Sequence, residues 1–310
     1  MPINRQTASF LQQRFNEVGI YPKGRHGQNF LVDLNLVDVL VRAAQLEKQD
    51  VVLEVGTGTG ALTGQMAALA GHVVTIEIDR QLHQLASEEL IDVPNVTMVL
   101  QDVLRNKNNI HDTIISAVEE QLQKIEGSRF KLAANLPYNI ATPLISNLLL
   151  TRITPYSMTV TIQKELADRI VAVPRTKDYS ALSIWIQSLC SAEIVRIMPP
   201  TVFWPRPKVD SAIIHIVPDE KKRAAIPDIA AYQKFVRSLF FHRRKFLRSV
   251  LISSFKEELE KPDIDRIMET VKMGAETRAE ELPVERILEL YNASRVVLAE
   301  SGKIDDWKAR

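Results

Sequence analysis

The sequence predicts an α/β protein with a seven-stranded, mostly parallel, doubly wound sheet and a smaller all-helical C-terminal domain. Short apolar runs rich in valine and isoleucine alternate with helix-like stretches, a pattern typical of parallel strands joined by helices. A glycine-rich stretch follows the first of these runs directly. Beyond about residue 218 nothing has the pattern of a strand, whereas helix-like stretches continue.

Seven segments are predicted to be strands, and several are continuously apolar, as strands buried on both faces are. They comprise residues 51–55, 72–78, 95–101, 130–134, 158–163, 192–198 and 211–217. The proline-rich residues 199–208 are too few for an ordinary helical crossover. We therefore expect the last two strands to form an antiparallel pair at the end of the sheet.

Helices are predicted between the first four strands, at residues 61–70, 81–90 and 110–125, and later at 166–173 and 180–188. Residues 217–227 are polar and charged and carry prolines near both ends, which is typical of a linker. We therefore expect a larger domain at residues 1–217 and a smaller one at residues 218–310. The smaller domain is predicted to hold helices at 229–255, 263–271 and 283–299.

The composition is that of an ordinary globular protein. The chain has 310 residues, 45% of them hydrophobic, and its net charge of +1 does not by itself indicate a nucleic-acid partner. One cysteine, Cys190, excludes an intramolecular disulfide and is expected to be a buried hydrophobic residue rather than a nucleophile. No apolar run reaches the roughly 18 residues of a membrane span, and residues 1–20 lack a signal-peptide core. We expect a cytoplasmic protein.

The glycine-rich residues 56–60 lie where the first strand would pass into a helix, so their backbone can approach a ligand and present N–H groups. Glu77 ends the second strand, where a carboxylate can accept both hydroxyls of a ribose. Asp102 follows the third strand and can accept the exocyclic amine of an adenine. The spacing differs from that of dinucleotide sites, and S-adenosylmethionine fits better, with Glu54 near its methionine end. A tight turn without a ligand is the simpler alternative.

Residues 28–31, Gln-Asn-Phe-Leu, precede the first strand. They can form a turn that enters a helix at residues 35–46. Alternatively, they can fold over the cofactor, with the side-chain amides of Gln28 and Asn29 meeting its polar groups. The composition of the segment leaves both interpretations open.

Asn135, Leu136, Pro137 and Tyr138 follow the fourth strand and suit the methylation of an amine on a flat ring. The Asn135 side-chain oxygen and the Leu136 carbonyl can accept the N–H protons, which favours a pyramidal nitrogen whose lone pair points at the methyl group. Pro137 fixes the direction of the carbonyl, and Tyr138 can stack on the base. Such catalysis works by positioning and dipoles and needs no general base. The alternative is a plain turn, because these residues favour turns.

A base inside a duplex cannot reach such a pocket, so the target must be flipped out or unpaired. Phe203 is a candidate for a second stacking wall, and the alternative is an aromatic side chain packed in a loop.

A basic stretch, residues 231–250, carries six basic residues and no acidic one. If residues 232–250 form one helix, Arg237, Arg244 and Arg248 share a face, and phosphate binding is favoured over a merely solvated face. No motif that reads sequence is present, so recognition of a structured RNA by shape is expected. The predicted RNA-binding residues, including four that can extend the surface toward the pocket, are Lys23, Arg25, Arg206, Lys208, Arg237, Arg243, Arg244, Lys245 and Arg248.

Together these motifs resemble the ribosomal RNA adenine dimethyltransferase family, most closely its small-subunit branch. The resemblance covers roughly residues 21–290. It rests on residues 27–31, 54–63, Glu77, Asp102, 135–138, 163–165, 179–183, 203–211, 241–247 and 278–282. The tail after about residue 299 has no counterpart.

The resemblance implies a Rossmann-like methyltransferase that uses S-adenosylmethionine, releases S-adenosylhomocysteine and needs no metal. It implies N6,N6-dimethylation of two adjacent adenosines near the 3′ end of 16S rRNA, in the 30S subunit or its precursor, during small-subunit biogenesis. The helical domain would dock on the 30S particle, and we expect a monomer. Target-amine contacts are implied for Asn135 and Leu136, with stacking by Tyr138 and Phe203. The expected donor-site residues are Gln28, Asn29, Leu31, Glu54, Gly56, Gly58, Gly60, Glu77, Asp102 and Asn135.

Two other functions stay open. One is a 23S rRNA adenine N6-methyltransferase of the resistance type, against which residues 203–211 and 278–282 argue because they match the small-subunit branch better. The other is a non-catalytic RNA-binding assembly factor on the same fold. The intact glycine stretch, Glu77 and residues 135–138 argue against a loss of catalysis.

Overall fold

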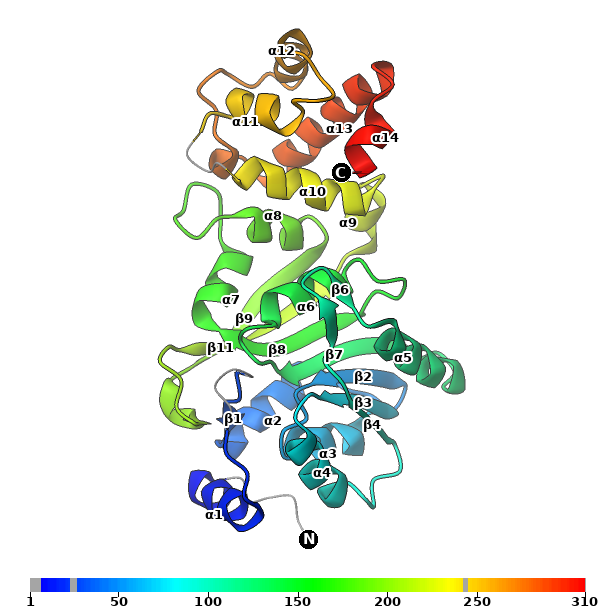
Figure 1. Ribbon diagram of the computed structural model, residues 1–310, viewed down its shortest axis with the longest axis vertical. Helices are drawn as coiled ribbons and strands as arrows, with labels where there is room; N and C mark the ends of the chain where they lie inside the picture. The colour runs from blue at the N-terminus through cyan, green and yellow to red at the C-terminus, as the bar shows by residue number, and fades with distance from the viewer. Residues whose placement is uncertain (1–6, 23–26, 242–244, 310) are drawn as a thin grey trace. The chain divides into compact units, whose positions relative to one another are not determined.

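The computed structural model describes residues 7–22, 27–241 and 245–309 (Figure 1). The chain divides into two compact units, one of residues Met1–Ala167 and Ala192–Pro218, the other of Asp168–Ser191 and Asp219–Arg310. The chain passes from the first unit to the second for the last time after Pro218, next to the boundary expected from the sequence. The second unit also takes in Asp168–Ser191, which the sequence prediction placed in the larger domain. Within that unit the Tyr179 hydroxyl donates to the Leu282 carbonyl at 2.8 Å, which ties this segment to the C-terminal helices.

The first unit is built on a seven-stranded sheet. Its order is β4 (Val96–Leu100), β3 (His72–Glu77), β2 (Asp50–Val55), β7 (Arg129–Asn135), β8 (Ser157–Gln163), β11 (Ser211–Pro218) and β9 (Cys190–Met198). The pairs from β4 to β8 are parallel and β11 is antiparallel to β8, so the predicted mostly parallel sheet is confirmed. The chain runs outward from β2 to β4 and then returns to the other side of β2. This reversal places a switch point between β2 and β7, where ligands bind in open α/β sheets.

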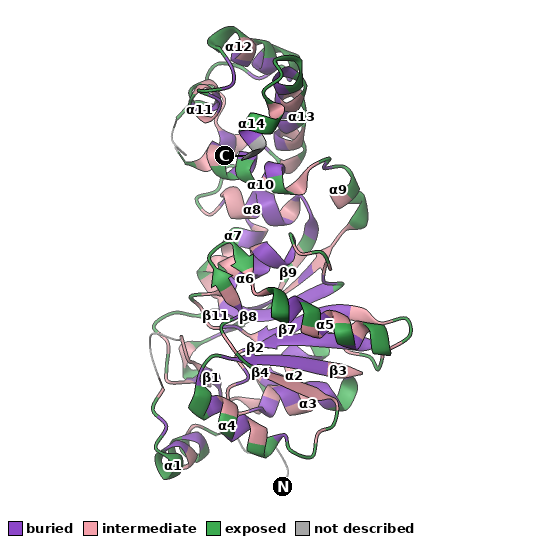
Figure 2. Cartoon of the chain, turned by 45° about the vertical axis from the view of Figure 1, so that its right-hand side comes forward, coloured by how far each residue is buried: buried purple, intermediate pink, exposed green. Residues whose placement is uncertain are grey.

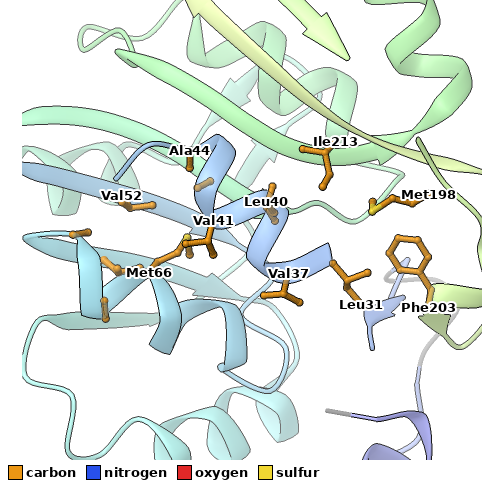
Figure 3. Packing of buried hydrophobic residues seen from close by; sticks show 14 residues of the cluster. Leu31, Val37, Leu40, Val41, Ala44, Val52, Met66, Met198, Phe203 and Ile213 are labelled. Carbon is orange, nitrogen blue, oxygen red and sulfur yellow. The ribbon is translucent and has the colours of Figure 1, made fainter. Parts of the chain in front are cut away.

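Apolar helix faces cover this sheet. The helices are α2 (Leu34–Ala43), α3 (Ala61–Leu69), α4 (Arg80–Glu89), α5 (Asp112–Lys124) and α6 (Ala141–Leu148). Leu40 of α2 and Met66 of α3 are fully buried against Val52 of β2, as Figure 3 shows. Strands β2, β7 and β8 are buried along most of their length (Figure 2). Such burial on both faces explains why their sequences are continuously apolar.

A second, two-stranded sheet was not expected from the sequence. β1 (Phe30–Leu31) pairs antiparallel with β10 (Phe203–Trp204), with Phe30 opposite Trp204 and Leu31 opposite Phe203. The Val32 amide extends the ladder by donating to the Val202 carbonyl at 2.9 Å. Phe30 and Leu31, at the end of the segment of residues 28–31, are therefore held in a strand pair. The helix α1 (Ala8–Val18), η2 (Pro200–Val202), β5 (Leu104–Asn106) and β6 (Asn109–Ile110) complete this unit.

The second unit is helical. It contains the second half of α7 (Lys164–Val171), followed by α8 (Ala181–Gln187), α9 (Glu220–Ala224), α10 (Ile229–Phe240), α11 (Leu247–Ser254), α12 (Lys261–Thr270), η3 (Ala279–Glu281), α13 (Val284–Glu300) and α14 (Ile304–Ala309). Tyr232, Phe235, Phe255 and Tyr291 are fully buried and form its aromatic core. Trp307 of α14 packs on Phe255 with ring centroids 5.6 Å apart. The tail without a recognised counterpart is therefore part of this core.

The single helix predicted over residues 229–255 is wrong. α10 ends at Phe240 and α11 begins at Leu247, and Phe241 between them is 83% exposed. The Leu247 amide donates to the Thr277 carbonyl at 2.7 Å instead of to a carbonyl one turn back. Apolar positions before and after the break keep a helical spacing, and no glycine or proline marks it, so periodicity could not reveal it.

No helix in the described part of the chain is long and apolar enough to cross a membrane.

Candidate active site

A cavity of about 300 Å³ opens at the carboxyl ends of β2, β3 and β7, next to the switch point of the sheet. Seven residues predicted for the donor site line it together with residues from the loops that follow these strands. The lining consists of Gly27, Gln28, Asn29, Phe30, Val55, Gly56, Gly58, Ile76, Glu77, Ile78, Leu82, Gln101, Asp102, Val103, Asn135, Leu136, Pro137, Asn139 and Ile140.

The glycine stretch forms one wall of the cavity, and the side chains of Pro137 and Phe30 lie close to it. Gly56 has φ 90° and a Cβ there would lie 3.4 Å from the Pro137 ring. Gly58 has φ 58° and a Cβ there would lie 3.2 Å from the Phe30 ring. Both positions therefore favour glycine for conformation, and Gly58 also favours it for space. The stretch ends at Gly60, the N-cap of α3.

Glu77 is 4% exposed and holds this wall in place. Its carboxylate accepts the Gly58 amide at 3.0 Å and the Asp79 amide at 2.9 Å. Burial raises the pKa of Glu77, while these backbone donors act in the opposite direction. Asp102, in contrast, is exposed, and its Oδ1 accepts the Leu104 amide at 2.9 Å. Both residues line the cavity, Glu77 as a buried and Asp102 as an exposed side chain.

The Asn135 side chain has a defined orientation at the end of β7. Its Nδ2 donates to the Asn29 carbonyl oxygen at 2.9 Å. A carbonyl can only accept, so the nitrogen must face Asn29 and the amide oxygen faces elsewhere. The Leu136 amide donates to the Thr161 carbonyl at 3.2 Å, which fixes the next peptide. The arrangement leaves the Asn135 side-chain oxygen as an acceptor beside the cavity.

The two predicted stacking residues do not line the cavity. The Tyr138 hydroxyl is hydrogen-bonded to Ser211 Oγ, and burial raises its pKa. Phe203 is 3% exposed and packs with Leu31 and Met198 in the hydrophobic core (Figure 3). The cause is the pairing of β1 with β10, which places both Phe203 and Leu31 toward the core. A stacking role for Phe203 therefore stays a sequence prediction.

Three residues predicted for the donor site are not among the residues that line the cavity: Leu31 in the core, Gly60 at the start of α3, and Glu54. Glu54 is 1% exposed and accepts the hydroxyls of Thr63 at 2.5 Å and Thr75 at 2.6 Å through one oxygen. Its other oxygen is buried without a hydrogen-bond partner among the described residues. Burial raises the pKa of Glu54 to about 8.

Sequence reasoning missed much of the apolar lining. Ile78 and Val103 follow the ends of β3 and β4, where a strand-end argument could have found them. Leu82 lies on the first turn of α4 and reads as an ordinary core position. Phe30 was treated only as part of the segment of residues 28–31. None of these four carries a polar group that would signal a site.

The predicted basic surface is only partly described. Lys23, Arg25, Arg243 and Arg244 lie outside the described residues. In the first unit Arg206 and Lys208 are exposed, and in the second unit Arg237 and Lys245 are exposed.

The expectation that the basic stretch has no compensating acid is wrong for Arg248. Its guanidinium forms a two-pronged ion pair with Asp265 of α12, at 2.5 and 2.8 Å. The acid comes from a neighbouring helix and was not visible in the local sequence. Because the stretch forms two helices, Arg237 and Arg248 also do not share a face of one helix.

The sheet and its glycine-walled cavity define a Rossmann-like methyltransferase. The chain belongs to the ribosomal RNA adenine dimethylase family, whose model matches residues 22–294. It is 38% identical to ribosomal RNA small subunit methyltransferase A of Lactiplantibacillus plantarum, over 89% of this chain and 90% of that protein. A protein of the same name from Caldanaerobacter subterraneus subsp. tengcongensis is 34% identical over 90% of this chain and 99% of its own length.

Solved structures share the fold. A dimethyladenosine transferase from Plasmodium falciparum superposes with a TM-score of 0.70 at 24% identity, covering 87% of this chain and 97% of that one. The 23S rRNA methyltransferase ErmE superposes with a TM-score of 0.60 at 24% identity, covering 85% and 98%. At such identities the structures establish the fold and not the substrate.

Proposed function

We propose that this chain uses S-adenosylmethionine to dimethylate the N6 atoms of two adjacent adenosines near the 3′ end of 16S rRNA, within the 30S subunit or its precursor. The observation that carries the proposal is the Asn135 amide, which is held by the Asn29 carbonyl at the edge of the glycine-walled cavity. The relatives named small subunit methyltransferase A, which align with nearly the whole chain, support the small-subunit target. A role in small-subunit biogenesis follows from that target.

The residues of the cavity fit S-adenosylmethionine. The two glycines give a wall without side chains, along which a ligand can pass close to the backbone. Glu77 keeps acceptor capacity for the ribose hydroxyls, since a carboxylate has about four acceptor positions and backbone amides take two. Asp102 can accept the adenine amine through the oxygen that Leu104 does not use. Gln28 completes the polar lining.

When bound, S-adenosylmethionine supplies an electrophilic methyl group on a sulfonium. Asn135 and Leu136 accept the two N–H protons of the target amine through their carbonyl oxygens and turn its lone pair toward that methyl group. The hydrogen bond to Asn29 keeps the Asn135 acceptor in place before the substrate arrives, so little reorganisation is needed. Pro137 fixes the path of the chain after the Leu136 carbonyl. The surplus proton leaves to solvent once the nitrogen is cationic.

The helical unit is proposed to bind the RNA through phosphate contacts, with the chain acting as a monomer. Arg237 and Lys245 are its exposed cations among the basic residues predicted from the sequence and described by the structure. Electrostatic contacts of this kind carry no sequence information, so the site on the RNA is selected by shape.

The proposal is tested by mapping methyl groups. Purified protein and labelled S-adenosylmethionine are added to 30S particles from cells that lack this protein, with 50S particles in a parallel reaction. We expect primer-extension stops at two adjacent adenosines near the 3′ end of 16S rRNA, and four methyl groups per particle. Transfer to 23S rRNA alone would establish the alternative target. Binding to 30S particles without transfer would support the non-catalytic assembly factor.

A further inference from the structure

We propose that helix α1, which precedes the residues matched by the family model, is a positioning element of the methyl-donor site and acts through Phe15 on Phe30. The inference rests on the proposed donor site and adds a residue to it. The family match begins at residue 22, whereas α1 ends at Val18.

The sequence builds α1 as a bounded helix. The Thr7 side chain accepts the Phe10 amide at its N-terminus, and Gly19 ends it with a left-handed φ of 67°. Leu11 and Phe15, one turn apart, are each 1% exposed, whereas Phe10 is 43% exposed. The helix therefore has one buried face.

That buried face packs on the back of the cavity wall. The core beneath α1 consists of Leu11, Phe15, Ile20, Phe30, Leu82 and Leu85. Two of these residues, Phe30 and Leu82, also line the cavity. The core beneath α1 and the proposed donor site thus share side chains, so a loss of packing in this core changes the position of residues that line the site.

Phe15 makes the central contact. Its ring meets the Phe30 ring edge-to-face, with centroids 5.2 Å apart, and meets the Trp204 ring at 5.5 Å. The Phe30 ring in turn stacks on the Trp204 ring, with centroids 6.3 Å apart, and lies against Gly58. The Gly58 amide donates to the Glu77 carboxylate, and this hydrogen bond holds the glycine wall in place. A chain of contacts therefore runs from Phe15 through Phe30 to the backbone amide beside the proposed ribose acceptor. Edge-to-face pairs restrict ring orientation as well as burying area.

The test compares Phe15→Ala with Phe10→Ala, a matched change on the exposed face of the same helix. For Phe15→Ala we expect the KM for S-adenosylmethionine to rise about tenfold with kcat changed less than about twofold. The reason is that the apparent affinity for the donor scales with the fraction of protein molecules in which the glycine wall is correctly placed. Phe10→Ala should match the wild type. Phe15→Leu keeps most of the apolar volume and should give an intermediate KM, and it replaces Phe15→Ala if that variant does not fold.

Hydrogen exchange without any donor separates this inference from the proposed function. In Phe15→Ala and Phe15→Leu the amides of Val32 and Gly58 should exchange faster, with amides in the centre of β7 unchanged. If the wild type fails to bind S-adenosylmethionine, the proposed function fails while the exchange result still decides the contact chain. KM and exchange equal to those of Phe10→Ala in both Phe15 variants would overturn the inference.

Discussion

Replacing Asn135 by alanine separates catalysis from donor binding. The change removes the side-chain oxygen that is proposed to accept an N–H proton of the target amine. Removing one preorganised hydrogen-bonding group at a reacting centre typically lowers kcat by about 100- to 1000-fold. The change also removes the hydrogen bond to the Asn29 carbonyl, 2.9 Å long. That bond contributes about 1 kcal/mol, so donor affinity should fall no more than about fivefold.

Single-turnover methyl transfer to unmethylated 30S particles measures the first effect, and calorimetric titration with S-adenosylhomocysteine measures the second. Asn108→Ala, an exposed asparagine in the turn between β5 and β6, is the control and should behave as the wild type in both assays. A rate for Asn135→Ala within about threefold of the wild type would refute the role assigned to the amide. A loss of donor binding as large as the loss of rate would show that Asn135 acts on the donor and not on the target amine.

Three further changes test other parts of the molecule. Glu54→Gln should flatten the dependence of stability on pH. Folded Glu54 keeps its proton between about pH 4.5 and 8 while the unfolded chain loses it, so the wild-type free energy of unfolding falls as pH rises through this window, by on the order of 5 kcal/mol. Urea titrations at several pH values check this, and an equal slope in both proteins would contradict it. Trp307→Ala should lower the free energy of unfolding of the helical unit by about 3–5 kcal/mol, because the Trp307 side chain is 7% exposed and packs on Phe255. An unchanged urea midpoint would exclude α14 from the core. Lys245→Ala should reduce the salt dependence of 30S binding by about one phosphate contact, and Arg248→Ala by less, since Asp265 already neutralises Arg248. The opposite ranking in a salt titration would refute the assignment.

The sheet could be predicted because each strand is encoded locally. Buried parallel strands need continuous apolar runs, and the seven predicted segments all correspond to strands of the sheet. The break between α10 and α11 could not be predicted, since no glycine or proline marks it and Leu247, the first residue after it in α11, donates its amide to the distant Thr277 carbonyl. The same holds for the pairing of β1 with β10, two short segments that have no strand pattern of their own.

The polar part of the site was predictable for a related reason. Glu77 and Asn135 end strands and Asp102 lies two residues beyond one, and the ends of neighbouring parallel strands meet at one edge. A strand points alternate side chains to opposite faces, and sequence position alone did not show that the Glu54 carboxylate lies among Thr63 and Thr75. Its place at the donor site stays a prediction. The burial of Phe203 could not be predicted because it depends on the unexpected partner strand, and its stacking role stays a prediction.

The pairing of Phe30 with Trp204 also sets an order of events during synthesis of the chain. The glycine stretch and Glu77 leave the translating ribosome early, yet β1 has no partner strand until Trp204 has also emerged. Contacts between such distant parts of a chain form late, because the intervening loop must first close. A nascent chain that ends before β10 therefore has an incomplete wall around the donor cavity. We therefore expect the cavity to be complete only when nearly the whole first unit has been made.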